Sequence, residues 1–156
     1  MIVRDTDGFH AELTERIHIH HEEVFACLTS AAGLSRWMCM AAEVDLREGG
    51  TVTFGWTEKM TRTTTVAILE YDTEGRITWD WYAGPEDVHA PLAWTVGPDP
   101  TPGEEATVVT LRQGPFAADL ESLVLMAEEV DAWRWRLCNL RSVLEARHDM
   151  RRHRPL

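Results

Sequence analysis

Tryptophan is the residue type here with the clearest capacity for chemistry, and the chain of 156 residues contains seven. An indole ring offers a broad apolar face and one N–H donor, so several rings together can stack on a planar or polycyclic ligand and orient it. Trp79 and Trp81 are two residues apart and therefore share one strand face with Ile77. The same rings could instead fill the interior, and the spacing is compatible with both uses.

The expected ligand-binding residues are those that the periodicity directs inward, together with neighbouring soft or apolar side chains. Methionine is flexible and polarisable, so it adapts to the outline of a ligand. The set comprises Trp37, Met38, Trp56, Trp79, Trp81, Trp94, Met126, Trp133 and Leu137. The pattern fixes the direction of Trp56 and Trp135 less well than that of the other tryptophans. The set predicts an aromatic-walled pocket for an apolar or aromatic small molecule.

A run of histidines and glutamates, residues 18–23, has the ligand types of a metal site. His18 and His20 share a strand face, but it is the face opposite Ile17 and should therefore meet solvent. The HExxH zinc motif is incomplete, because Phe25 stands at its second histidine position. We expect no metal site here.

Acid–base catalysis requires titratable groups inside a pocket. The candidates are Asp45, Glu70, Asp80, His89 and Arg112. Arg134 and Asn139, beside the apolar stripe of the last helix, could present polar groups to a ligand. A solvated surface position or a structural salt bridge is the more usual role of each. The sequence has no GxSxG motif, no spaced Cys–His pair and no phosphate-binding glycine loop. It assigns no catalytic residue and no cofactor, and it leaves open whether the protein is an enzyme.

Composition narrows the class of partner. The net charge of −11 argues against nucleic acid and anionic membranes, which need a positive surface. The three cysteines are widely spaced and form no metal motif, so we expect reduced, packed thiols. No apolar run approaches the ~18 residues of a membrane span, and residues 1–13 lack the apolar core of a signal peptide. We expect a cytoplasmic protein, either a monomer or a homodimer.

Hydrophobic periodicity predicts the elements that hold these residues. Residues 15–20 alternate between apolar and polar side chains, as in a half-buried strand. Two short helices should follow, the first with Glu22 and Glu23 in its first turn, where the helix dipole favours them. The second helix runs through Leu34 and Trp37.

Strands are expected over the middle of the chain, and a long helix after it. Turns at 49–50, 72–75 and 84–87 and a Pro- and Gly-rich loop at 97–103 separate β-type runs. After Asp119, apolar residues recur every three or four positions to about residue 147. Short turns between successive strands imply a curved antiparallel sheet. The length suits one domain, 1–156, with loosely ordered ends at about 1–12 and 150–156.

Four stretches of the sequence carry a family resemblance. They are residues 17–38, 44–50 (VDLREGG), 76–81 and 133–140 (WRWRLCNL). The chain resembles the SRPBCC superfamily, and within it the branch homologous to the C-terminal domain of the activator of the 90-kDa heat-shock-protein ATPase. The resemblance implies an α+β helix-grip fold, also called START-like or birch-pollen-allergen-like. In that fold a curved antiparallel sheet of six to seven strands surrounds a long C-terminal helix, with two short helices after the first strand.

The resemblance also implies a range of functions. The superfamily includes lipid carriers, polyketide cyclases, lyases, hormone receptors and proteins that trap reactive natural products. Our first hypothesis is a binding protein that holds an apolar or aromatic ligand between sheet and helix, for transport, sensing or sequestration, natural-product self-resistance included. The second is a cyclase- or lyase-type enzyme using the same pocket. The third is a co-chaperone-like interaction protein of the stress response.

Overall fold

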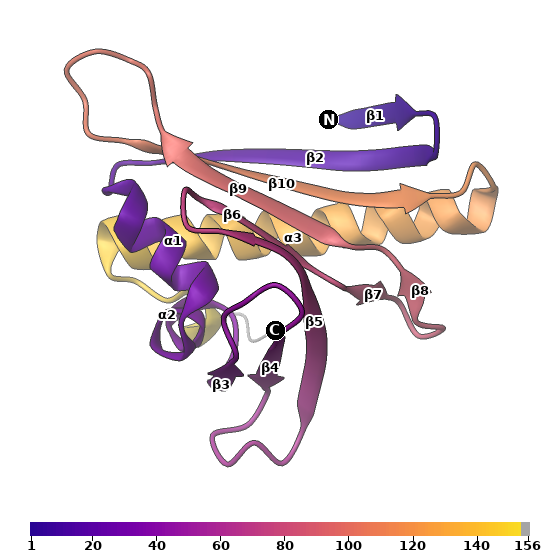
Figure 1. Ribbon diagram of the computed structural model, residues 1–156, viewed down its shortest axis with the longest axis horizontal. Helices are drawn as coiled ribbons and strands as arrows, with labels where there is room; N and C mark the ends of the chain where they lie inside the picture. The colour runs from indigo at the N-terminus through magenta and orange to yellow at the C-terminus, as the bar shows by residue number, and fades with distance from the viewer. Residues whose placement is uncertain (154–156) are drawn as a thin grey trace.

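The computed structural model describes residues 1–153 and has the predicted α+β architecture (Figure 1). The elements are β1 (Ile2–Asp5), β2 (Gly8–Ile17), α1 (His21–Thr29), α2 (Ala31–Trp37), β3 (Ala41–Val44), β4 (Thr51–Gly55), β5 (Thr63–Asp72), β6 (Arg76–Trp79), β7 (Tyr82–Ala83), β8 (Val88–His89), β9 (Leu92–Pro98), β10 (Thr107–Phe116), α3 (Leu120–Ala146) and the 3₁₀ turn η1 (Met150–Arg152). Among the described residues, no helix has both the length and the apolar character needed to span a membrane.

Eight strands form one antiparallel sheet in the order β1-β2-β10-β9-β6-β5-β4-β3, and β7 pairs with β8 in a separate hairpin. Figure 1 shows α3 running along one side of the curved sheet. Helices α1 and α2 lie near its C-terminal end, and the β7–β8 hairpin projects nearer its N-terminal half. The helix-grip fold predicted from the sequence is therefore confirmed, with eight strands in the sheet where six to seven were expected.

Apolar residues line the inner face of the sheet in rows that cross several strands. Leu13 on β2 lies opposite Leu111 on β10, which in turn lies opposite Trp94 on β9. Trp94 lies opposite Ile77 on β6. All four are buried, because alternate residues of each strand point to the same face. The row places the Trp94 indole in the middle of the interior.

Helix α3 begins and ends with capping interactions. The Asp119 carboxylate accepts hydrogen bonds from the backbone N–H of Ser122 at 2.8 Å and from its hydroxyl at 3.0 Å. At the other end, Arg147 adopts a left-handed conformation with a φ of 52°. The buried stripe between them contains Met126, Trp133, Leu137, Leu140 and Leu144. These are residues that the sequence predicted to face the core.

Regular structure occurs near both ends of the described part of the chain. Residues 2–5 form β1, which pairs with β2, and the Met1 ammonium donates to the Glu12 carbonyl at 2.7 Å. Gly8 permits the turn between them, since its φ is +139° and a Cβ there would lie 2.6 Å from the Phe116 carbonyl oxygen. At the other end, residues 150–152 form η1, and residues 154–156 lie outside the described part.

Asn139 joins the C-terminal segment to the core. Its side chain is fully buried, donates to the Trp37 carbonyl at 2.9 Å and accepts from the Met150 N–H at 2.7 Å. Arg151 adds bonds to the carbonyls of Cys39 at 2.8 Å and Ser35 at 3.1 Å. The amide of Asn139 therefore connects α2, α3 and η1.

Replacing Asn139 with leucine should lower the free energy of unfolding by about 2–4 kcal/mol, because the buried Trp37 carbonyl and the partly buried Met150 N–H lose their partners. Urea denaturation measures this loss. Ser142→Ala is the matched control on α3: it removes an exposed bond to the His148 carbonyl and should cost less than about 1 kcal/mol. Equal stability of Asn139→Leu and the native chain would contradict the assignment.

Candidate functional site

Six of the seven tryptophans form one aromatic cluster between the sheet and α3. Trp94 lies at its centre, with ring centroids 5.3 Å from Trp79, 5.7 Å from Trp133 and 6.2 Å from Trp37. Trp81 contacts Trp133 at 5.4 Å. Most of these pairs meet edge to face, the arrangement that aromatic quadrupoles favour.

Phe54 extends the aromatic cluster to Trp56. Its ring centroid lies 5.2 Å from Trp79, 5.8 Å from Trp81 and 6.0 Å from Trp56. Trp135 lies on α3 outside these contacts and is partly exposed. The aromatic cluster thus consists of Trp37, Phe54, Trp56, Trp79, Trp81, Trp94 and Trp133.

The predicted ligand-binding residues differ in burial. Six of them are almost completely buried: Trp37, Met38, Trp79, Trp94, Trp133 and Leu137. Trp81 and Met126 keep a small exposed area, and Trp56 is partly buried. The structure therefore brings the predicted set together and packs most of it between sheet and helix.

Five of the six indole N–H groups of the aromatic cluster fall into two groups. Three have acceptors: Trp37 donates to the Cys27 carbonyl at 2.8 Å, Trp56 to the Thr64 hydroxyl at 2.9 Å and Trp133 to the Glu129 carboxylate at 2.9 Å. The Nε1 atoms of Trp79 and Trp94 are buried and have no partner among the described residues. Such buried donors are uncommon in folded proteins, because an unmade hydrogen bond costs free energy.

Glu129 is the acid closest to the aromatic cluster. One oxygen of its carboxylate, Oε2, accepts from Trp133 Nε1 and, at 3.2 Å, from Gln113 Nε2 on β10. Arg136 lies two turns further along α3, with its guanidinium carbon 4.5 Å from the centre of the Trp133 ring. Burial lowers the pKa of Arg136, and the Glu129 charge opposes that shift. The positions of Glu129 and Arg136 beside the aromatic cluster were not predicted from the sequence, because a charged residue beside an apolar stripe ordinarily lies in solvent.

A groove of about 440 Å³ lies between the β7–β8 hairpin and the first half of α3. It is lined by Ala83, Gly84, Pro85, Glu86, Val88, Asp119, Glu121, Ser122, Val124, Leu125 and Glu128. Gly84 allows the hairpin to approach the helix, because its φ is +72° and a Cβ there would lie 2.8 Å from Leu125 Cδ1.

The groove adjoins the aromatic cluster through Trp81. That residue directly precedes β7, and its carbonyl accepts from the Ala90 N–H at 2.9 Å, just beyond β8. None of the nine predicted ligand-binding residues lines the groove itself. The sequence did not reveal it, because two short strands form it with a helix that begins about thirty residues later.

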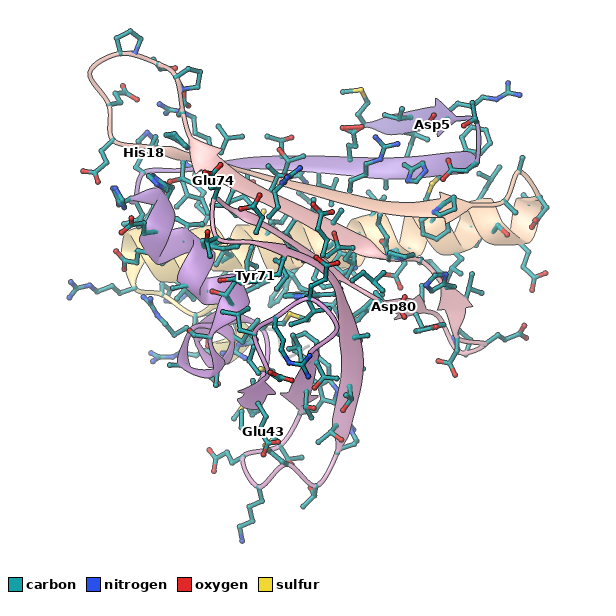
Figure 2. All side chains as sticks on the ribbon, viewed as in Figure 1. Asp5, His18, Glu43, Tyr71, Glu74 and Asp80 are labelled. Carbon is teal, nitrogen blue, oxygen red and sulfur yellow. The ribbon has the colours of Figure 1, made fainter. Side chains whose placement is uncertain are left out.

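The titratable residues singled out in the sequence lie in ion pairs or hydrogen bonds. The pairs are Asp45 with Arg47, Glu70 with Arg76, Asp80 with His89, Arg112 with Asp5 and Arg134 with Glu15. Asp80 lies beside β7 and β8 (Figure 2) and bonds His89 across the base of the hairpin. The Asp80–His89 pair lies next to the groove, because Val88, the neighbour of His89 in the chain, lines the groove.

Two of the three cysteine thiols, Cys27 and Cys39, are poor nucleophiles. Cys27 and Cys39 are buried, and Cys138 is partly buried. Burial raises the pKa of Cys39 to about 11 and also raises the pKa of Cys27. Both therefore remain protonated at neutral pH, as expected of thiols packed in a core.

His18 and His20 are exposed, as expected, but both lie outside the strand predicted over residues 15–20, because β2 ends at Ile17. His18 bonds Glu145 at 3.1 Å. Asp5, Asp7 and His10 have metal-ligand atoms within 4.8 Å of one another. However, Arg112 donates to Asp5 at 2.7 Å and His10 bonds Asp7 at 2.9 Å. A cation would compete with the guanidinium for Asp5, so an ion-pair cluster accounts for this geometry.

Replacing Glu129 with alanine should lower the free energy of unfolding by about 2–4 kcal/mol, since Trp133 Nε1 and Gln113 Nε2 lose their common acceptor. Glu129→Gln should lower the free energy of unfolding by less, because its amide oxygen can still accept a hydrogen bond from these donors. The matched control is Glu128→Ala, an exposed neighbour expected to change stability by less than about 0.5 kcal/mol. Equal losses for the two alanine variants in urea denaturation would exclude the proposed role of Glu129.

Comparison with known proteins identifies the family of the chain and agrees with its fold. Residues 18–145 match the family described as "Activator of Hsp90 ATPase homolog 1-like protein". No curated protein matches the chain. Three similar solved structures show the same fold. A Staphylococcus saprophyticus protein is 18% identical with a TM-score of 0.74, covering 91% of this chain and 96% of its own.

The other two structures are those of an Aha1 protein and an Hsp90 activator. The Aha1 dimer from Colwellia psychrerythraea is 18% identical with a TM-score of 0.69, covering 87% of this chain and 96% of its own. An Hsp90 activator from Plasmodium falciparum is 19% identical with a TM-score of 0.63, covering 88% and 94%. Because the family match spans most of its length, the chain belongs to the activator of Hsp90 ATPase homolog 1-like family.

Proposed function

We propose that this protein binds a small apolar or aromatic molecule between the sheet and α3, at the end where the β7–β8 hairpin meets the helix. The groove next to the aromatic cluster is the observation that supports this most directly. Its volume, about 440 Å³, falls within the range of small-molecule sites, ≈ 300–1,000 Å³. The ligand would lie on the apolar side chains of the groove and reach the edge of Trp81.

The predicted residues would serve this ligand in two ways. Trp81, which directly precedes β7, would contact the part of the ligand that extends past the groove lining. The other predicted residues would form the wall behind it and would meet the ligand only if the aromatic cluster rearranged: Trp37, Met38, Trp56, Trp79, Trp94, Met126, Trp133 and Leu137. Indole faces suit a planar partner, and methionine adapts to its outline.

Binding without reaction is our preferred interpretation. Transport, sensing and sequestration, natural-product self-resistance included, all need stoichiometric retention of an unmodified ligand. A cyclase or lyase would need a proton-transfer group beside the ligand. The Asp80–His89 pair, which joins a carboxylate to an imidazole at the base of the hairpin, is one such candidate. Turnover that disappears in Asp80→Asn, with binding retained, would favour the enzyme.

A second function, interaction with Hsp90, is favoured by the family itself. Two similar structures are those of an Aha1 dimer and an Hsp90 activator. Exposed apolar side chains around the groove, Tyr82, Val88, Leu120 and Val124, would suit a protein partner. In this alternative, the chain should stimulate Hsp90 ATPase activity, and small molecules should not raise its melting temperature.

The test is a thermal-shift screen against polycyclic aromatics, fatty acids, sterols and polyketide-like compounds, with tryptophan fluorescence read in parallel. A compound at about a hundred times its dissociation constant should stabilise the native state by about 2.7 kcal/mol. Val124→Glu should then raise the dissociation constant about tenfold or more, since a carboxylate in the groove must lose water on binding. Val124 is 50% exposed, so the fold should tolerate the change.

Leu69→Glu on β5 is the matched control. It makes the same change of charge at an apolar residue of similar exposure, 45%, that does not line the groove. It should leave the dissociation constant unchanged. Equal weakening by both variants would place the ligand elsewhere, and a screen in which no compound raises the melting temperature would overturn the small-molecule proposal.

A further inference from the structure

Arg136 is the one arginine with a buried, unpartnered Nε among the described residues. Its guanidinium stacks on Trp133 and forms no ion pair or hydrogen bond with a described residue. Contact with an aromatic ring compensates a guanidinium only in part, since the buried Nε–H of Arg136 remains without a described acceptor. Leaving such donors unpaired costs more for a charged group than for a neutral one.

Arg136 lies at one end of a row of donors without acceptors. Trp94 is 5.7 Å from Trp133, the ring that Arg136 covers, and Trp79 is 5.3 Å from Trp94. Both indoles are nearly fully buried, and neither Nε1 has a described partner. Glu129 is the carboxylate whose charge acts on Arg136. It does not form an ion pair with the arginine, and its Oε2 already accepts hydrogen bonds from Trp133 and Gln113. This region has an excess of donors over acceptors.

We propose that Arg136 anchors a carboxylate of the ligand, so that the molecule bound is an apolar or aromatic acid. A guanidinium matches a carboxylate with two parallel N–H···O bonds, and stacking on Trp133 holds it in a fixed plane. The inference rests on the proposed function, because it names the ligand class of that same site.

The position of Arg136 also limits the length of the ligand. Leu125, Glu129 and Arg136 are spaced four and seven residues apart, so they lie on the same side of α3. At 1.5 Å per residue, Arg136 is about 16 Å from the Leu125 level of the groove. An acid with an extended apolar body can therefore span from the groove to Arg136. The long-range field of a chain with net charge −11 opposes an anion, so any preference for one requires a local cation.

The experiment compares pyrenebutyrate with its neutral primary amide, which has the same shape without the charge. Energy transfer from tryptophan to pyrene gives the dissociation constant of each compound. The native chain should bind the acid at least about tenfold more tightly than the amide. Arg136→Met should remove that preference and leave amide binding unchanged.

Arg134→Met is the matched control, since it removes a cation from the same helix at a residue that pairs with Glu15 on the surface. It should keep the preference for the acid. Arg136→Lys keeps the positive charge but lacks the planar guanidinium that can donate two parallel hydrogen bonds, so its preference for the acid over the amide should be intermediate. This variant replaces Arg136→Met in the experiment if Arg136→Met does not fold.

Equal affinity of the native chain for acid and amide would overturn the Arg136 anchor while leaving the small-molecule proposal in place. So would an equal loss in Arg134→Met and Arg136→Met, because that result would mean a general charge effect. If neither compound binds, and the wider screen also fails, both proposals fall together.

Discussion

The contact between Trp133 on α3 and the tryptophans of the sheet is the interaction on which the rest of the structure depends. Trp133 packs edge to face against both Trp94 and Trp81, and its N–H bonds Glu129. A long helix can lie across a curved sheet only if large side chains fill the space between them at the density of a protein interior. The aromatic cluster provides that filling, and it thereby sets the distance between helix and sheet.

That packing has a polar consequence. Every indole placed in the interior carries an N–H donor, whereas the interior of a sheet supplies few free acceptors. Backbone or side-chain oxygens satisfy Trp37, Trp56 and Trp133, and the donors of Trp79 and Trp94 remain without described partners. The same excess of donors includes Arg136. An interior with this imbalance suits a ligand that brings oxygen atoms with it, which links the packing to the proposed ligand class.

The sequence predicted the regular elements well because they follow from local periodicity. The α3 stripe from Met126 to Leu144 and the alternation around Trp79 and Trp94 are visible in the sequence, and the structure agrees. Trp81 shows the limit of this reasoning: β6 ends at Trp79, yet Trp81 still contacts Trp133 because the Asp80 N–H bonds the Ala67 carbonyl beyond the strand end.

The features that could not be predicted arise from contacts between distant segments. The groove needs β7, β8 and α3 together, and Glu129 acquires its role only when Gln113 on β10 lies beside it. The pairing of β1 with β2 was missed because residues 1–5 are short, mixed in polarity and lie before a turn. No single stretch of sequence contains these relations.

The most direct test of the ligand-binding account is the ¹H–¹⁵N spectrum of the seven indole N–H groups, recorded while pyrenebutyrate is added. If the aromatic cluster is the wall of the ligand site, the Trp81 and Trp133 signals should shift as the compound binds, and those of Trp79 and Trp94 should follow. Trp135, outside the aromatic cluster, should stay unchanged. Binding that moves only the Trp135 signal, or none of the seven, would show that the cluster is structural packing and would contradict the account.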